Sequence, residues 1–338
     1  MSVLKLSVMS RVSRVADFQE QAGGGAVRCL LCPRFCVIGE NTAGFCGARK
    51  CVGERVGERS GECVGERAVG SREGSLIAAG YGLVSSLALD PIEKKPLRMF
   101  RSGAKILSVG GFGCNLRCGF CQNHDISMIR VSEATRSSCA ACDASDTFSH
   151  PEPVGQSRYM PPGEILSLAA QTVSKGNIGV AYTYNEPFIN FEYLLDCARL
   201  VHDAGLSNVV VSNGYINKEP LEMILPYIDA MNIDLKGFTN GFYEKVAGKL
   251  DPVMETIAAS FSRCHVEVTT LVIPGENEND IPEIAAWLSS LNPDIPLHLS
   301  RFFPRYLYSD RLETSRDTIF KLRDAAGKYL NNVFTGNM

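Results

Sequence analysis

The chain has 338 residues, of which 45% are hydrophobic and 21% charged, so it can bury a sizeable core and is neither a disordered nor a fibrous protein. Its 34 basic and 37 acidic residues give a net charge of −3, which argues against a nucleic-acid-binding or membrane-surface protein. The longest uncharged stretch, residues 75–89, is too short and too rich in Gly and Ser to span a bilayer, and the first residues lack the apolar region of a secretion signal. We therefore expect a cytoplasmic protein without nucleic-acid or membrane partners.

Cysteine is frequent and clustered. Of the 13 cysteines, six lie between Cys29 and Cys63 and five between Cys114 and Cys142. Cytoplasmic thiols stay reduced, and a chain of this length does not need disulfides to fold. The clusters therefore favour metal ligation over cross-linking.

The first hundred residues differ in composition from the rest. Residues 1–27 carry no clear signal beyond three consecutive glycines, and residues 28–103 form a segment rich in cysteine and glycine. Within it, VGER occurs at 52–55, 56–59 and 64–67, a repeat too short and polar for a solenoid, which we interpret as a variable loop or hairpin. Residues 75–90 are predicted to form one or two short strands.

From residue 104 to 338 apolar strands alternate with amphipathic helices. Strands are predicted at 105–111, 177–184, 208–212, 230–235, 265–273, 296–302 and 331–336. The clearest helices are predicted at 161–176, 188–205 and 314–329. This alternation predicts an α/β fold with a parallel sheet, either a full or partial (β/α) TIM-type barrel or an open doubly wound sheet, with an inserted loop at about 132–160.

Three cysteines follow the first of these strands. Cys114, Cys118 and Cys121 have the spacing C-x3-C-x2-C, on a loop at the strand end where barrels build their active sites. Three thiolates can hold a [4Fe–4S] cluster and leave one iron open to a small ligand. The alternatives are a zinc site completed by a distant ligand such as His124, and thiols without metal.

The surrounding sequence, GCNLRCGFCQN, resembles the cluster loop of radical S-adenosylmethionine (SAM) enzymes. Further motifs in order, DPIEKKPL, YTYNEP, SNGY, NIDLKG, TLVIPGEN and HLSRFFPRY, are similar to the AmmeMemoRadiSam system radical SAM enzymes, relatives of pyruvate formate-lyase activating enzyme. The resemblance covers residues 28–336. It implies that the open iron chelates the amino and carboxylate groups of SAM, and that one-electron reduction cleaves SAM to methionine and a 5′-deoxyadenosyl radical.

The resemblance also implies roles for single residues. Cys114, Cys118 and Cys121 would hold the cluster, and Phe120 would pack near the adenine of SAM. Asn185 and Glu186 stand where the family has a glycine-glycine-glutamate strand that contacts the methionine amino group, although both glycines are absent here.

Further along the chain, Ser212 and Asn213 end a strand from which relatives reach the SAM ribose. Asp234 and Lys236 match the Asp-x-Lys of activating enzymes, and His298 matches a histidine near the methionine end of SAM.

Each of these SAM contacts has a structural alternative. Asp234 and Lys236 could form an ion pair, Glu186 could cap the helix predicted at 188–205, and His298 could be a hydrogen-bonded histidine in the barrel wall.

We therefore expect a radical SAM oxidoreductase that abstracts hydrogen from a substrate, by analogy with activating enzymes a glycine in a partner protein. Its electron donor would be a protein such as ferredoxin or flavodoxin. A non-catalytic iron–sulfur electron carrier and a zinc-stabilised binding module are the alternative functions.

A second cysteine group lies near the N-terminus. Cys29, Cys32, Cys36 and Cys46 have the spacing C-x2-C-x3-C-x9-C, and Pro33 and several glycines around them favour tight turns. Four thiolates suffice for tetrahedral zinc or a second iron–sulfur cluster. Reduced structural cysteines and a redox pair are the alternatives.

Overall fold

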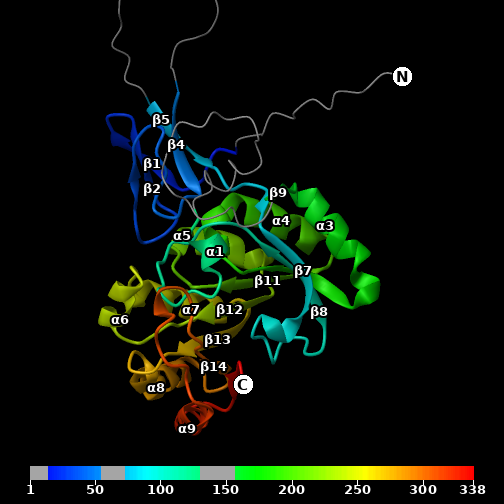
Figure 1. Cartoon of the computed structure of the whole chain (residues 1–338). Helices are drawn as coiled ribbons and strands as arrows, with labels where there is room; N and C mark the ends of the chain where they lie inside the picture. The colour runs from blue at the N-terminus through cyan, green and yellow to red at the C-terminus, as the bar shows by residue number, and fades with distance from the viewer. Residues whose placement is uncertain (1–13, 55–72, 130–156) are drawn as a thin grey trace, which may run out of the picture.

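The structure is a computed structural model, which describes residues 14–54, 73–129 and 157–338 (Figure 1). Most of the loop predicted at 132–160 lies outside these ranges, as do residues 1–13 and the last two VGER copies. None of the helices in the described ranges is long and apolar enough to cross a membrane.

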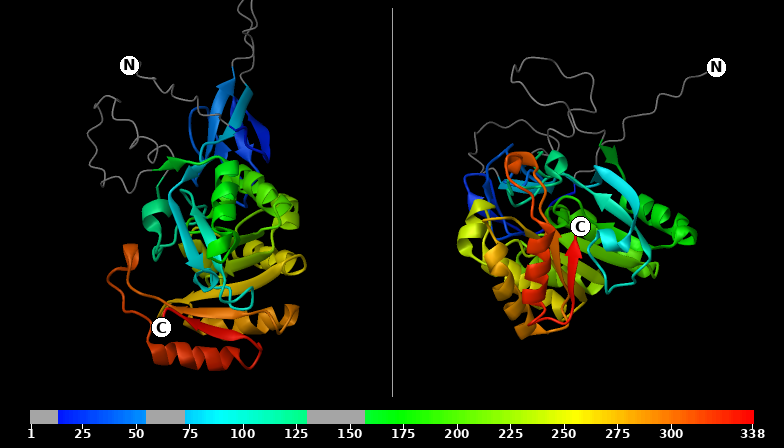
Figure 2. Two further views of the ribbon diagram at one scale, coloured as in Figure 1. Left: turned by 90° about the vertical axis from the view of Figure 1, so that its right-hand side faces the viewer. Right: turned by 60° about the horizontal axis from the view of Figure 1, so that its bottom comes forward.

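Two small antiparallel sheets come first in the chain, at the opposite end of the molecule from the C-terminal helix and strand (Figure 2). Their strands are β1 (Gln19–Gly23), β2 (Ala26–Cys29) and β3 (Val37–Ile38) in one sheet, and β4 (Arg49–Glu54) and β5 (Glu73–Ala78) in the other. A short pair, β6 (Leu83–Val84) with β9 (Arg158–Tyr159), follows. The first two sheets carry the N-terminal cysteines.

An eight-stranded sheet forms the centre of the described structure. Its strands are β7 (Ser86–Pro91), β8 (Lys105–Gly110), β10 (Asn177–Tyr182), β11 (Ser207–Ser212), β12 (Ala230–Asp234), β13 (His265–Val272), β14 (Leu297–Arg301) and β15 (Val333–Gly336). They are ordered β15-β14-β13-β12-β11-β10-β8-β7. All neighbours from β8 to β15 are parallel, and β7 pairs antiparallel with β8. The sheet confirms the predicted fold class in its partial-barrel form, with β7 and β15 at the edges.

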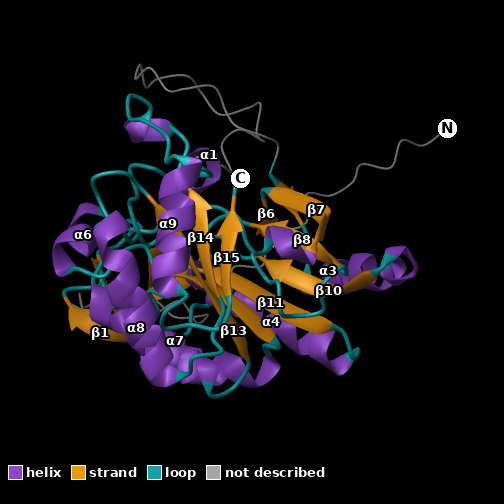
Figure 3. Ribbon diagram, turned by 90° about the horizontal axis from the view of Figure 1, so that it is seen from below, coloured by secondary structure: helices purple, strands orange, loops and turns teal. Residues whose placement is uncertain are grey.

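Helices connect the parallel strands and lie outside the sheet (Figure 3). They are α1 (His124–Ser127), α3 (Pro162–Gln171), α4 (Phe191–Asp203), α5 (Lys218–Ile224), α6 (Asn240–Lys245), α7 (Leu250–Phe261), α8 (Ile281–Leu291) and α9 (Arg316–Ala326). Short 3-10 turns are η1 (Ile92–Lys94), η2 (Val173–Lys175), η3 (Pro187–Asn190), η4 (Leu225–Tyr227), η5 (Glu278–Asp280) and η6 (Tyr306–Tyr308).

Apolar periodicity explains why these elements form. On α4, Phe191, Leu194, Leu195, Ala198 and Val201 are all buried, as the spacing of one helical face requires. The two helices predicted at 161–176 and 188–205 are each divided between an α-helix and a 3-10 turn. The first ends at Gly176, whose φ of +88° suits glycine at a helix end.

A buried carboxylate closes the barrel interior near the N-terminal ends of its strands. Glu267 on β13 is fully buried and lies 2.9 Å from the Nε2 atom of His265 and 2.5 Å from that of His298. It also accepts hydrogen bonds from the backbone N–H groups of Arg98 and Met99. Burial would raise the pKa of Glu267, but these hydrogen bonds lower it to about 2. Glu267 thus fastens the segment after η1 to the barrel.

Candidate active site

A cavity of about 340 Å³ opens at the C-terminal ends of the barrel strands. The loops after β8, β10, β11 and β12 all contribute to it, as expected because the C-terminal ends of parallel strands meet at one side of a barrel. Of the residues predicted from the sequence as cluster or SAM ligands, those lining it are Cys114, Cys118, Phe120, Cys121, Asn185, Glu186, Ser212, Asn213, Asp234 and Lys236. Folding therefore brings together residues from four separate sequence motifs.

The three cysteines of the first motif reach the cavity on the loop after β8. Gly113 begins this loop with a φ of +85°, and a Cβ atom there would lie 2.3 Å from the carbonyl oxygen of Cys46, so only glycine fits. Burial raises the pKa of Cys118 to about 11 and raises the pKa values of Cys114 and Cys121 as well. A metal that binds these cysteines would have to displace the thiol protons.

The donor set suits an iron–sulfur cluster. In the described ranges no group of three or more His, Cys, Asp or Glu side chains is gathered around the position of a single metal ion. Three thiols on one loop, arranged around a cavity, match the ligands of a cluster that spreads them over several irons. His124, the alternative fourth ligand of zinc, is not among the lining residues, and its ring stacks on Tyr306 at 4.6 Å between centroids.

The segment after β10 holds the start of the cysteine loop. Tyr184 has a φ of +72°, so it adopts the left-handed conformation that a glycine would take more readily. The next residue, Asn185, accepts a hydrogen bond from the N–H of Gly111 at 2.8 Å and donates one to the carbonyl of Gly113 at 3.1 Å. The chain thus adopts a left-handed conformation at this strand end without a glycine.

Glu186, the residue after Asn185 in this segment, is buried. Its carboxylate accepts hydrogen bonds from the Ser212 hydroxyl at 2.8 Å, the Asn213 N–H at 2.8 Å and the Phe188 N–H at 3.0 Å. Burial raises the pKa of Glu186 to about 7, although these hydrogen bonds oppose the shift. The bond from Phe188 caps η3, so Glu186 both caps a helical turn, as one alternative predicted, and faces the cavity.

Asp234 and Lys236 follow β12 and form an ion pair of 2.9 Å. Burial would lower the pKa of Lys236, but the neighbouring Asp234 carboxylate raises it, so the ammonium group stays charged. The predicted ion pair is present, and both of its members also line the cavity.

His298 is placed differently from the other predicted SAM contacts. It is buried on β14, bonded to Glu267, and its ring stacks on that of Phe334 with 5.3 Å between centroids. Ser300, two residues further along the same strand, lines the cavity, whereas His298 is not among the lining residues. The side chain of His298 is thus directed to Glu267 and Phe334 and does not line the cavity.

Sequence reasoning missed a charged group that also lines the cavity. Lys94 and Lys95 line the cavity, and both bond to Asp90, at 3.0 and 2.9 Å. The Tyr184 hydroxyl donates to the same carboxylate at 2.7 Å. Asp90, Lys94 and Lys95 belong to the DPIEKKPL motif, which contributed to the resemblance but suggested no role for single residues.

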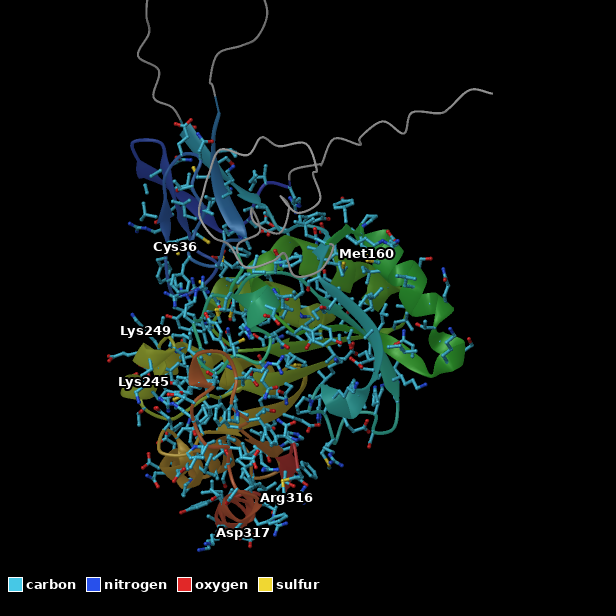
Figure 4. The ribbon with its side chains drawn as sticks, in the orientation of Figure 1. Cys36, Met160, Lys245, Lys249, Arg316 and Asp317 are labelled. Atoms are coloured by element: carbon cyan, nitrogen blue, oxygen red, sulfur yellow. The ribbon has the colours of Figure 1, made fainter. Side chains whose placement is uncertain are left out.

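The four N-terminal cysteines also meet. Cys29, Cys32, Cys36 and Cys46 line one small pocket together with Arg34 and Arg49, and Figure 4 shows Cys36 on the side of the N-terminal sheets nearest the barrel. The Cys29 N–H donates to the Cys36 carbonyl at 2.9 Å. Burial raises the pKa of Cys32 to about 12 and also raises those of Cys29 and Cys46, although Arg49 lowers the last two.

Comparison with known proteins identifies the family of this chain. The model of the radical SAM superfamily matches residues 108–288, which include the cysteine loop and the strands from β10 to β13. The chain belongs to the radical SAM superfamily. The protein is therefore an enzyme of SAM-derived radical chemistry, with an iron–sulfur cluster and SAM as its cofactors.

Its relatives include two proteins of Methanocaldococcus jannaschii. The uncharacterized protein MJ0808 is 37% identical over 331 residues, covering 96% of this chain and 85% of that protein. The uncharacterized protein MJ0804 is 24% identical over 204 residues, covering 58% and 65%.

Two similar solved structures have TM-scores below 0.5. A domain of pyruvate-formate lyase-activating enzyme from Bacteroides vulgatus has a TM-score of 0.41 and 19% identity, covering 47% of this chain and 99% of that one. QueE from Escherichia coli has a TM-score of 0.47 and 13% identity, covering 77% and 95%.

Alanine substitutions should separate Asp234 from His298. We expect Asp234→Ala to weaken SAM binding by about 10-fold or more, because a carboxylate facing the cavity is lost. His298→Ala should leave SAM affinity near that of the wild type and lower the free energy of unfolding by about 1–3 kcal/mol, because Glu267 loses a buried partner. Equilibrium dialysis with SAM and urea unfolding measure the two effects. A comparable loss of SAM affinity in His298→Ala would place that histidine in the SAM site.

Proposed function

We propose that Cys114, Cys118 and Cys121 hold a [4Fe–4S] cluster, and that the residues facing them bind SAM for radical formation. The observation that carries this proposal is the shared cavity, in which the three thiols lie opposite Glu186, Asn213, Asp234 and Lys236. The cluster, when bound and reduced by one electron, cleaves SAM to methionine and a 5′-deoxyadenosyl radical that abstracts hydrogen from the substrate.

The side chains around the cavity suit the parts of SAM. Glu186 and Asp234 supply carboxylates for the ammonium and ribose hydroxyl groups, and Lys236 supplies a buried cation for the carboxylate. Phe120 packs near Phe242 and Tyr308, at 6.2 and 5.7 Å between ring centroids, and offers an aromatic surface to adenine.

Ser212 and Asn213 help to position other residues of the site. Both donate to Glu186, and the side-chain amide of Asn213 also lies 2.9 Å from the Asn115 side chain and 3.5 Å from the Cys114 sulfur. This network orients Glu186 and the cysteine loop relative to each other before SAM arrives. Side chains that need to move little when SAM binds hold the reacting groups in the geometry that the reaction requires.

We further propose that the substrate is a glycine-containing segment of a partner protein, as in activating enzymes. The cavity of about 340 Å³ is near the lower end of the usual range for small-molecule pockets, roughly 300–1,000 Å³. Cluster and SAM together would fill most of it. A substrate would then have to enter from the surface, as an extended peptide segment can.

The same proposal includes a protein electron donor, such as ferredoxin or flavodoxin, and a cytoplasmic location, because thiol-ligated clusters need a reducing compartment. It also includes zinc or a second iron–sulfur cluster at Cys29, Cys32, Cys36 and Cys46, since both accept thiolate ligands. An electron carrier or zinc-stabilised module would not need the side chains that face the cysteine loop.

The direct test is SAM cleavage. Protein reconstituted anaerobically with iron and sulfide, then given dithionite and SAM, is expected to release 5′-deoxyadenosine and methionine in equal amounts. Chromatography of the quenched mixture measures both products, and omission of dithionite is the control. A full cluster that produces no 5′-deoxyadenosine would contradict the proposed function and favour an electron carrier.

A further inference from the structure

The pocket of the N-terminal cysteines contains a buried arginine. Arg49 is 1% exposed, and its guanidinium lies 2.9 Å from Glu192 and donates to the carbonyl of Asp17 at 3.0 Å. The Nε atom of Arg49 has no hydrogen-bond partner among the described residues. A buried donor without an acceptor is costly, so an acceptor in this pocket would stabilise it.

The rest of the pocket is suited to an anionic metal centre. Leu31, Ile38 and Ile189 are almost fully buried and give it apolar walls. Four thiolates around zinc or an iron–sulfur cluster leave a net negative charge, and a buried charge needs a partner of opposite sign. Arg49 is the almost fully buried cation in the pocket, and its free N–H can donate to a thiolate sulfur.

This pocket is joined directly to the SAM-cluster loop. Arg117 donates to the carbonyl of Cys114 at 2.7 Å and to that of Phe45 at 2.6 Å, and so links one residue of the loop triad to the neighbour of Cys46. Arg34 donates to the carbonyl of Asn115 at 2.6 Å. Both guanidiniums lie over the Phe45 ring, at 3.5 and 4.2 Å from its centroid.

We infer that Arg49 is the counter-ion of an iron–sulfur cluster held by Cys29, Cys32, Cys36 and Cys46, and that this centre positions the SAM-cluster loop. The inference rests on the N-terminal metal included in the proposed function. Binding the metal fixes Cys46, whose carbonyl lies against Gly113 of the loop and whose neighbour Phe45 accepts the hydrogen bond from Arg117.

The first experiment isolates the N-terminal centre. A Cys114→Ala/Cys118→Ala/Cys121→Ala variant, purified and reconstituted anaerobically, is expected to retain about four iron atoms per chain, as elemental analysis measures. The visible absorption of a cluster shows that this iron is bound as iron–sulfur. Zinc in place of iron, or neither metal, in a folded triple variant would overturn the inference. Because SAM cleavage is not the readout, this result is independent of whether the enzyme is a radical former.

The second experiment tests Arg49 as a positioning residue in the same triple-variant background. Arg49→Met is expected to lower metal affinity by about 10- to 100-fold in competition with a chelator, and Arg49→Lys much less. Arg49→Met/Glu192→Gln, which leaves no unpaired carboxylate, should show the same loss while its circular dichroism remains that of the parent. Wild-type metal affinity in this folded double variant would overturn the role of Arg49.

The third experiment measures the coupling. Cys29→Ser/Cys32→Ser in the otherwise native chain is expected to lose the N-terminal metal and several-fold of the SAM-cluster occupancy, seen as a smaller SAM-dependent change in the electron paramagnetic resonance signal. Cys264→Ser, a change on a partly buried cysteine outside both groups, should alter neither. A full SAM-responsive cluster in Cys29→Ser/Cys32→Ser would overturn the coupling.

Discussion

Cys118→Ala is expected to abolish SAM cleavage, with 5′-deoxyadenosine falling below detection. Cys118 is buried between the other two cysteines of the loop and lines the cavity with them. With two thiolates left, the cluster would lose its protein-held geometry, and the electron needed for cleavage would have no path to SAM. Cys114→Ala and Cys121→Ala should act in the same way.

The measurement is 5′-deoxyadenosine release, together with iron content, in anaerobically reconstituted protein. Cys264→Ala is the matched control, since its thiol contacts the backbone of Ser260 at 3.6 Å, outside both cysteine groups. It should retain nearly full activity. Continued SAM cleavage by Cys118→Ala would show that the cluster is held elsewhere.

Glu186→Gln is expected to weaken SAM binding and, at the same time, to change how stability depends on pH. A hydrogen bond to a charged group contributes about 1.5–3 kcal/mol, so loss of the carboxylate should reduce SAM affinity by about 10- to 100-fold. Equilibrium dialysis against the cluster-loaded protein measures this affinity.

Glu186→Gln is expected to gain stability relative to the wild type as pH rises, whereas it loses SAM affinity. Burial is the largest influence on Glu186 and raises its pKa from 4.5 to about 7 in the folded protein. Between these values the folded chain holds a proton that the unfolded chain has lost, so the folded state becomes less stable as pH rises through this window. From pH 5 to pH 8 the free energy of unfolding of the wild type falls by about 2.5 kcal/mol for this reason. A glutamine at position 186 does not titrate, so the variant does not undergo this loss.

Urea unfolding of the cluster-free protein at pH 5 and pH 8 tests this expectation. The free energy of unfolding of Glu186→Gln relative to the wild type should improve by about 2.5 kcal/mol between the two pH values. Glu222→Gln, at an exposed carboxylate on α5, is the control and should show no such change. A pH-independent difference between Glu186→Gln and the wild type would mean that Glu186 is ionised throughout the range.

Local sequence patterns were sufficient to predict most of the barrel. The parallel strands β8 and β10 to β15 and the helices α3, α4 and α9 were predicted close to their observed positions, because an apolar period reports which face of an element is buried. The short strand β9 was not predicted. The cysteine loop was predicted for a related reason, since its three thiols lie within eight residues. The family resemblance implied Glu186 and Asp234 as SAM contacts, and both lie at or just after the C-terminal ends of parallel strands, which gather on one side of a barrel.

Other features depend on register and on contacts between distant parts of the chain. His298 pairs in register with Thr269, which lines the cavity, but its ring bonds to Glu267 and is not among the lining residues, and no local pattern records that partner. The left-handed conformation of Tyr184 could not be predicted either, because a local pattern favours glycine at such a position.

The sequence by itself determined the order of elements, the superfamily and the two groups of cysteines. Only the tertiary structure decided that the two groups adjoin. Arg34 and Asn115, which join them, are 81 residues apart, and Arg49 meets Glu192 across the boundary between the N-terminal sheets and the barrel. The physical reason is that periodicity and spacing encode what each segment buries, whereas the partner it is buried against follows from how all the segments pack together.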